Sequence, residues 1–317
     1  MLQHVRSACA EVARRARSVT VDQTAIAAYA SSLPLDQARA PQFDTEHHFK
    51  GSPLDTAAFV LTLDAINFGS GYFPHLAKRP GMSGYFTIAT SLKDHYERRG
   101  PIAPYQLVEV TPADCAAIFG QDAENEPAME LMALFARALN DLGHFTERRY
   151  RGRWQMLIES ANGSAIALVD ILRQMPFFND VALYGGFAVP FYKRAQITAT
   201  DLAIALPDDP LGQFRDLDQL TIFADNLVPH VLRVDGILRY EPDLAATIDS
   251  EQLLEPGSAR EVEIRACGLH AVELMVKSLR DSGEQITAAG LDYVLWNRGQ
   301  QPRYKAIPRH RARCVYY

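Results

Sequence analysis

Apolar residues recur along most of this chain at the three- and four-residue spacing of helices that bury one face. Residues 1–19 follow this spacing and predict an amphipathic helix. Residues 52–55 (Ser-Pro-Leu-Asp) combine a capping serine, a first-turn proline and a first-turn acid, so they predict a helix through the apolar run that follows. Ser258 and Glu261 have the spacing of a capping box before a second long helix. That helix contains Gly268, which costs about 1 kcal/mol relative to alanine.

Strand signals are fewer. Residues 105–110 (YQLVEV) alternate between polar and apolar side chains and predict a strand. Residues 180–192 contain Gly185-Gly186 between two short apolar runs, which is typical of a hairpin. There is no repeat and no shift of composition that marks a boundary. We therefore expect residues 1–317 to form a single, mostly α-helical domain with a small β element.

Composition excludes several classes of protein. The net charge of −6 provides no global basic field for a nucleic-acid backbone, and no apolar run approaches the ~18 residues of a membrane span. The four cysteines are far apart in the sequence, which favours reduced thiols and a cytoplasmic protein (Cys9, Cys115, Cys267 and Cys314). The motifs of phosphate loops, dinucleotide sites, serine hydrolases and metal centres are absent. Carboxylates, lysines and aromatic residues are left as candidate chemical groups.

Asp225 is an acid directly behind the apolar run Ile222-Phe223-Ala224 and before a helical pattern. An aspartate at this place usually acts as an N-cap or N′ residue, here for a helix of about residues 227–238. It could also form part of a pocket wall. The two roles are compatible, because helix-terminal amides also fix the orientation of a carboxylate.

Lys193 and Arg194 open a helical pattern, where two cations oppose the helix dipole. An anion bound at this helix start would relieve that cost. The alternative, which the residues alone favour, is a pair of solvated surface cations.

Asp292 lies in a helical segment with Tyr293 beside it and Trp296 one turn later. Asp64 lies in a similar apolar helical run. Each acid is either a helix-surface residue or a buried hydrogen-bond acceptor. The residues alone favour the surface for both.

Five blocks in this order resemble the queuosine salvage protein family: VPFYKRAQI (189–197), TIFADNLVPHVL (221–232), EVEIRACGLHAVEL (261–274), LDYVLW (291–296) and HRARCVYY (310–317). LDAINFG (63–69) and SGYF (83–86) match more loosely. The resemblance runs from about residue 45 to residue 317. Residues 1–44 form a helical N-terminal segment outside the main resemblance.

The resemblance implies hydrolysis of the N-glycosidic bond of queuosine 5′-phosphate, which releases queuine and ribose 5-phosphate for salvage into tRNA modification. It also implies a helical fold similar to that of DNA glycosylases and a reaction without metal or organic cofactor. We expect a monomer that binds a small nucleotide and neither a membrane nor nucleic acid. Two alternatives stay open, namely a base-excising glycosylase acting on DNA or tRNA, and a non-catalytic nucleotide-binding protein. The acidic net charge speaks against nucleic acid.

The resemblance also implies roles for particular residues. Asp225 is matched to the carboxylate at the reacting sugar, where it could serve as stabiliser, general base or nucleophile. Phe223 is matched to the wall of the base pocket and Asp292 to recognition of the base. A histidine before residue 63 also belongs to the family's site, and the spacing does not choose between His47 and His48.

The chemistry of the substrate adds further candidates. The phosphate needs a cation, for which Lys193 is the best candidate and Arg194 a weaker one. The secondary amine and the diol of queuine need carboxylates or hydrogen-bond acceptors, which Asp292 or Asp64 could provide. The flat base needs an aromatic face, which Tyr293 or Trp296 could supply in addition to Phe223.

Overall fold

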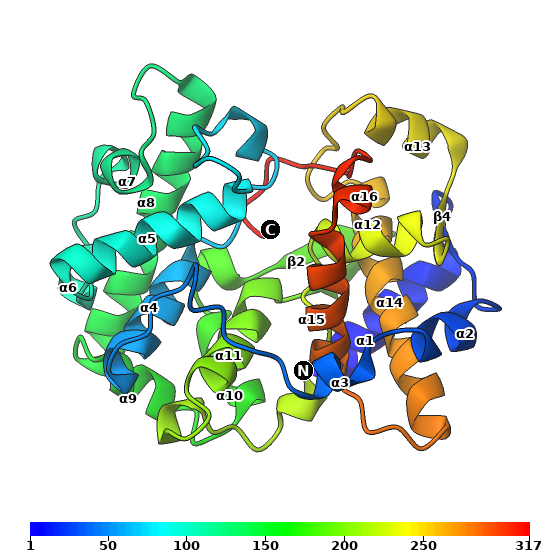
Figure 1. Ribbon diagram of the computed structural model, residues 1–317, viewed down its shortest axis with the longest axis horizontal. Coiled ribbons are helices and arrows are strands. Elements are labelled where there is room, and N and C mark those ends of the chain that lie inside the picture. The colour runs from blue at the N-terminus through cyan, green and yellow to red at the C-terminus, as the bar shows by residue number, and fades with distance from the viewer. The chain divides into compact units, whose positions relative to one another are not determined.

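The computed structural model describes residues 1–317, which fall into two compact units, each assembled from separated stretches of the chain (Figure 1). Unit 1 comprises Met1–Pro41, Asp180–Lys193 and Asp216–Arg313. Unit 2 comprises Gln42–Asn179, Arg194–Arg215 and Cys314–Tyr317. Both units are mostly helical, which confirms the predicted fold class. That residues 1–317 act as one domain stays a prediction.

Unit 1 is built around one long helix. Its helices are α1 (Leu2–Arg15), α2 (Ile26–Ser31), α3 (Leu35–Arg39), α12 (Leu227–Val234), α13 (Pro242–Asp249), α14 (Ala259–Asp281), α15 (Ala288–Gly299) and α16 (Pro302–Lys305), with the 3-10 turn η4 (Leu217–Gln219). Helix α14 contacts α1, α2, α12 and α15. Residues 1–15 are thereby part of the packing of unit 1.

Two small antiparallel sheets complete unit 1. Strand β1 (Val19–Val21) pairs with β4 (Leu238–Tyr240), and β2 (Val181–Tyr184) pairs with β3 (Phe187–Pro190). The second sheet is the predicted hairpin. Its turn residues Gly185 and Gly186 have φ of 54° and 89°, the left-handed region that a two-residue turn of this kind requires.

Helix α14 carries three charged residues that are only 2% exposed, namely Glu261, Glu263 and Arg265. Glu263 accepts hydrogen bonds from the amides of Arg17 (3.1 Å) and Ser18 (2.6 Å) and from the hydroxyl of Tyr184 (2.8 Å). Buried charges are tolerated when they are paired or hydrogen-bonded. The charged residues of α14 therefore join stretches of unit 1 that are far apart in the sequence.

Unit 2 is built around α8, a helix of 25 residues. Its helices are α4 (Pro53–Ala65), α5 (Gly84–Arg99), α6 (Pro104–Leu107), α7 (Pro112–Phe119), α8 (Glu126–Tyr150), α9 (Trp154–Glu159), α10 (Ala165–Leu172) and α11 (Lys193–Ala205), with the 3-10 turns η1 (Phe73–His75), η2 (Pro176–Phe178) and η3 (Pro210–Gly212). Helix α11 starts at Lys193, the last residue of the middle stretch of unit 1, and its other residues belong to unit 2. Helix α8 contacts α4, α6, α7 and α9. No helix has both the length and the apolar content needed to cross a membrane.

The predicted strand at residues 105–110 is wrong. Residues 104–107 form helix α6, which begins with Pro104 at its first position, and the side chain of Gln106 accepts a hydrogen bond from the amide of Ala103 (2.9 Å). This helix packs against α8 at Gly143, where an added Cβ would lie 2.7 Å from the carbonyl oxygen of Pro104 and 2.8 Å from the amide nitrogen of Val108. The helix-starting residues and the close packing against α8 therefore outweigh the alternation of polar and apolar side chains that predicted a strand.

We expect Gly143→Ala to destabilise the protein, although alanine is the better helix former. The added methyl group meets backbone atoms, which cannot rotate away, and overpacking of this kind costs about 1–3 kcal/mol. Thermal or urea unfolding measures the change. His144→Ala, at the next and exposed position of α8, is the control and should change stability by less than about 0.5 kcal/mol. A Gly143→Ala variant as stable as the control would contradict the close approach.

Candidate functional site

Asp225 ends an irregular, buried segment that leads into helix α12. Residues 221–224 are at most 6% exposed, whereas Asp225 is half-buried. Its Oδ1 accepts hydrogen bonds from the amides of Leu227 (2.8 Å) and Val228 (3.0 Å). Asp225 thus precedes the N-cap residue Asn226, which confirms the predicted N′ role. Two helix-terminal amides fix the orientation of the carboxylate.

Asp292 lies beside this segment. Its Oδ1 accepts a hydrogen bond from the amide of Phe223 at 2.9 Å. Burial, followed by the negative charge of Asp225, raises the pKa of Asp292 well above its ordinary value of 3.8, while the Phe223 amide and the charge of Lys193 act in the opposite direction. A raised pKa favours the protonated carboxyl group, whose O–H can donate a hydrogen bond. Two neighbouring acids therefore sit in different environments, an arrangement that separates acid and base roles.

Lys193 belongs to the same cluster. It is 5% exposed, and its backbone amide donates a hydrogen bond to Oδ2 of Asp180 (3.3 Å). Its ammonium acts electrostatically on Asp292. The favoured alternative of a solvated surface cation is wrong for this residue.

Arg194 has a structural role within unit 2. It is 1% exposed, and its guanidinium packs on the rings of Phe68 and Phe178, with centroids 4.7 and 4.9 Å away. It donates hydrogen bonds to the carbonyl groups of four residues at the ends of three segments, namely Asp64 (3.3 Å), Ala65, Phe177 and Val315 (2.7 Å). The solvated-cation alternative is wrong here as well. Two of these carbonyls are at the end of α4 and a third is in the turn η2, where carbonyls lack intrahelical partners, whereas Val315 lies outside the helices.

The surface positions favoured for Asp292 and Asp64 are also wrong. Asp292 is 5% exposed and Asp64 is 1% exposed. Asp64 lies in a helix whose residues 56–65 are all buried, so one-sided amphipathicity does not apply to it. Asp292 is among the buried residues of α15. Tyr293 and Trp296 are half-buried on α15, and Trp296 lies one turn from Asp292.

Arg309 is a cation near Asp225 that the sequence did not point to. Burial lowers the pKa of its guanidinium, and the negative charge of Asp225 opposes this effect. Arg309 immediately precedes the block at residues 310–317, which is the only signal the sequence offered for it.

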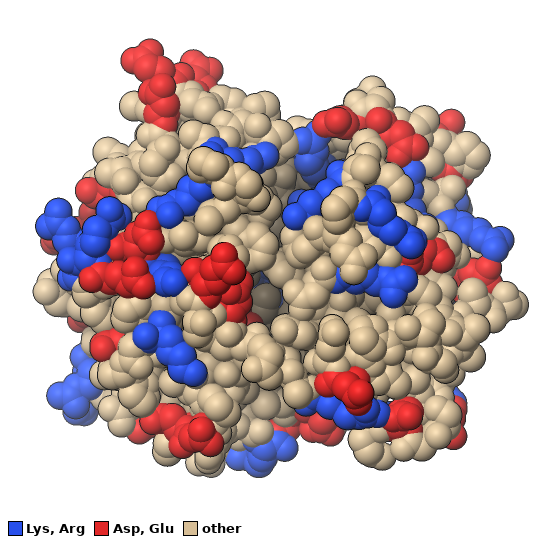
Figure 2. Space-filling view, viewed as in Figure 1, with Lys and Arg blue, Asp and Glu red and all other residues tan.

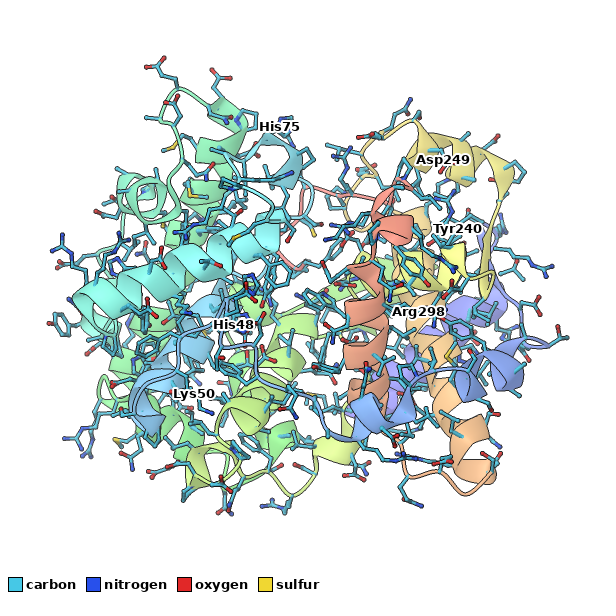
Figure 3. The ribbon with its side chains drawn as sticks, in the orientation of Figure 1. His48, Lys50, His75, Tyr240, Asp249 and Arg298 are labelled. Atoms are coloured by element: carbon cyan, nitrogen blue, oxygen red, sulfur yellow. The ribbon has the colours of Figure 1, made fainter.

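The adjacent histidines of unit 2 have different environments. Nδ1 of His47 shares a hydrogen bond with Oδ2 of Asp44 at 2.7 Å, and its ring packs on Phe86. Nε2 of His48, which is labelled in Figure 3, shares a hydrogen bond with the hydroxyl of Tyr85 at 2.9 Å. Its Nδ1 is buried with no partner in the protein. Burial lowers the pKa of His48 to about 4, so its imidazole is neutral near pH 7.

Carboxylates act on Tyr85, the partner of His48. Burial and then the charges of Asp201, Asp64 and Asp44 raise the pKa of Tyr85 well above its ordinary value. The phenol therefore keeps its proton and can donate a hydrogen bond. Tyr85 lies in SGYF, a block that matched the family loosely, whereas no signal in the sequence pointed to Asp201.

The structure thus collects the predicted residues in two groups. Within unit 1, Phe223, Asp225, Asp292 and Lys193 are linked by a hydrogen bond or by charge, and Tyr293 and Trp296 share helix α15 with Asp292. Within unit 2, His48 and Asp64 both act on Tyr85, while His47 is paired with Asp44.

Comparison with known proteins adds the family. The model of a family described as "Queuosine salvage protein" matches residues 47–317. A Sphaerobacter thermophilus protein named queuosine 5′-phosphate N-glycosylase/hydrolase is 37% identical over 312 residues, which cover 96% of this chain and 95% of that protein. Proteins of the same name from Dictyostelium discoideum and Mus musculus are 32% and 30% identical, over 83% and 96% of this chain and 78% and 96% of their own lengths.

We expect Asp292→Asn to gain stability relative to the wild type as pH rises. Because the pKa of Asp292 is raised in the folded protein, its contribution to stability is fully present below the unfolded pKa and is lost as pH rises through the folded pKa. Asparagine keeps an acceptor for the Phe223 amide and does not ionise. Urea unfolding at about pH 5 and about pH 8 measures the difference in unfolding free energy between variant and wild type.

The control for this measurement is Asp218→Asn, at an exposed position shortly before the segment that contains Phe223. Its difference from the wild type should be the same at both pH values. A pH-independent difference for Asp292→Asn would show that Asp292 titrates as an ordinary carboxylate.

Proposed function

The chain belongs to the queuosine salvage protein family, and we propose that it hydrolyses the N-glycosidic bond of queuosine 5′-phosphate to release queuine and ribose 5-phosphate. The near full-length similarity to proteins named for this activity supports the reaction. One observation supports assigning the reaction to particular residues. The carboxylate of Asp225 is held by two helix amides and lies near Asp292, an acid of raised pKa.

Asp225 is the group proposed to act at the sugar. Cleavage of an N-glycosidic bond leaves positive charge on the ribose, in a transition state that resembles an oxocarbenium ion. A carboxylate of fixed orientation stabilises this charge without reorganising, and it can also orient or deprotonate the attacking water. The amides of Leu227 and Val228 both bind Oδ1, so Oδ2 takes part in neither of these bonds.

Asp292 is proposed to act at the base. Queuine is a 7-deazaguanine and lacks the ring nitrogen that is often protonated in purines, so its departure needs help from hydrogen bonds at other edges. The protonated carboxyl group of Asp292 can donate one. Phe223, whose amide anchors Asp292, Tyr293 and Trp296 are proposed to supply aromatic surface to the flat base.

The remaining roles follow from charge. Lys193 is proposed to bind an anionic part of the substrate, with the 5′-phosphate as its partner. His48, Tyr85 and Asp64 are proposed to bind polar groups of the substrate, while His47 is proposed to support the loop through Asp44.

The finer properties of the protein are proposals as well. We propose a fold of the DNA glycosylase kind and a monomer that acts on free nucleotide in the cytoplasm. Four buried cysteine thiols support a reducing compartment. The net charge of −6 supports a small substrate over tRNA or DNA, and acidic and basic side chains are interspersed on the face seen in Figure 2.

The test offers the purified protein queuosine, queuosine 5′-phosphate and queuosine-containing tRNA separately and follows queuine by chromatography. We expect queuine from the 5′-phosphate, and Asp225→Asn should lower kcat/KM on the order of 10²–10³-fold, the loss typical of one key electrostatic group. Asp218→Asn, an exposed upstream aspartate, should retain the wild-type rate. Binding of the nucleotide without release of queuine would overturn the enzymatic assignment, and release from tRNA alone would reassign the substrate.

The two histidines provide a matched pair of variants. We expect His48→Gln to lower kcat/KM about tenfold, the equivalent of one hydrogen bond, because the unpartnered Nδ1 of His48 is proposed to bind substrate. His47→Gln should have a smaller effect, because Nδ1 of His47 is already engaged by Asp44. Steady-state kinetics on queuosine 5′-phosphate compares the two. A larger loss for His47→Gln would exchange the proposed roles.

A further inference from the structure

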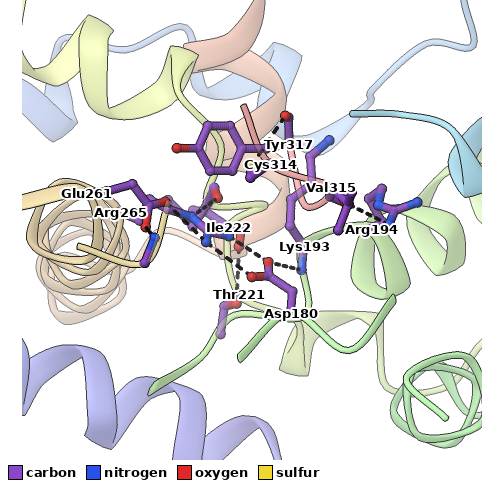
Figure 4. Close-up of polar contacts among 12 residues, drawn as sticks. Asp180, Lys193, Arg194, Thr221, Ile222, Glu261, Arg265, Cys314, Val315 and Tyr317 are labelled. Carbon is purple, nitrogen blue, oxygen red and sulfur yellow. Dashed lines mark hydrogen bonds and ion pairs between the residues drawn. The ribbon is translucent and has the colours of Figure 1, made fainter. Parts of the chain in front are cut away.

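Arg265 of helix α14 connects two segments that carry proposed site residues. Its guanidinium is 2% exposed, and Nε donates a hydrogen bond to the carbonyl oxygen of Ala224 at 2.9 Å. Nη1 and Nη2 donate to Oδ1 (3.1 Å) and Oδ2 (2.6 Å) of Asp180. The same side chain therefore holds the residue before Asp225 and the acid that binds the amide of Lys193 (Figure 4).

Asp180 fixes the start of helix α11 at three successive amides. Its carbonyl oxygen accepts from Phe191 (2.9 Å) and Tyr192 (3.2 Å), and its Oδ2 accepts from Lys193 (3.3 Å). Tyr192 has φ of 50°, a left-handed conformation that is unfavourable for a residue with a side chain. Such strain persists where the surroundings over-determine the backbone, and it clusters at functional sites.

We propose that the Arg265–Asp180 ion pair is the positioning device of the site in unit 1, an inference that rests on the proposed function. All three guanidinium nitrogens and both carboxylate oxygens are engaged within the protein, and both side chains are 2% exposed. The pair does not touch substrate. It acts through Lys193, by way of the strained turn at Tyr192, and through Asp225, by way of Ala224.

The position of Arg265 favours this role over a purely stabilising one. The planar fork binds a carboxylate in one geometry, which a point charge does not do. The ring of Phe191 lies 4.0 Å from the guanidinium and restricts its plane further. A displacement of about 1 Å at a reacting group is enough to cost on the order of 10² in rate.

The test is a double-mutant cycle between Asp180→Asn and Lys193→Ala, measured as kcat/KM for queuosine 5′-phosphate on folded protein. Each single variant should lose about 10–100-fold. In the Lys193→Ala background, Asp180→Asn should cost clearly less than in the wild-type background, because the part of its effect that acts through Lys193 disappears with that residue and only the part that acts through Asp225 remains. Multiplied losses would overturn the positioning role.

Asp180→Asn leaves the buried guanidinium with only the more distant carboxylate of Glu261, at 3.5 Å, as a counter-ion, and the variant can fail to fold. The second variant is therefore Asp180→Asn with Arg265→Met, which removes both charges of the pair at similar volume, a change often tolerated in a core. Glu261, which loses the guanidinium at 3.5 Å, keeps the hydrogen bond from the amide of Gly257. A folded double variant with kcat/KM lowered about 10-fold or more supports positioning, and one with wild-type kcat/KM overturns it.

Asp170→Asn breaks the exposed pair with Arg173 and should leave kcat/KM unchanged. If the wild type itself released no queuine, the proposed function would fail. If the wild type released queuine but the losses of Asp180→Asn and Lys193→Ala multiplied in the double variant, only the positioning role would fail.

Discussion

A charge buried in helix α14 must be paired, and much of unit 1 is arranged around that requirement. Removing one partner of a buried ion pair costs about 3–5 kcal/mol, because the remaining charge has no water to solvate it. Arg265 meets the requirement with Asp180 and with the carbonyl of Ala224, and Glu263 meets it with the amides of Arg17 and Ser18. The two charged side chains of α14 therefore hold three segments together: the start of the β2–β3 hairpin, the segment before α12 and the chain after α1.

The same low-dielectric surroundings make the two acids near Phe223 unequal. Asp225 is half-buried, and two amides at the start of a helix hold its carboxylate in one orientation. Asp292 is almost fully buried and lies near that charge, so its proton is held more tightly. One residue type thereby supplies an anion for a cationic sugar and a proton donor for a departing base. Burial and helix geometry are sufficient to create this difference, and neither requires a special residue.

Sequence patterns predicted the features that depend on near neighbours. The Gly185-Gly186 turn, the cap at Ser258 and the N′ role of Asp225 all follow from residues within a few positions, and each is present. The resemblance to the family, which depends on ordered blocks, located the residues around Asp225 and Asp292. These predictions did not need the packing of the whole molecule.

The failures share a physical cause. Lys193, Asp292 and Asp64 were assigned to the surface because a charged residue in a helix is usually solvated, yet all three are buried. Asp292 binds the amide of Phe223, 69 residues earlier, and Arg265 binds Asp180, 85 residues earlier. A local pattern cannot show which buried charge will find its partner. Tyr85 and Asp180 were overlooked for the same reason.

Gly268 shows how packing and the site are connected. In isolation it weakens helix α14, but an added Cβ would lie 2.9 Å from Cγ of Pro229, in the first turn of α12. The missing side chain lets α12 lie directly against α14, one turn from Arg265. The distance between these two helices determines whether the guanidinium reaches the carbonyl of Ala224. The glycine's cost in helix propensity is therefore offset by a contact that holds the start of α12, and with it Asp225, against the buried charge of α14.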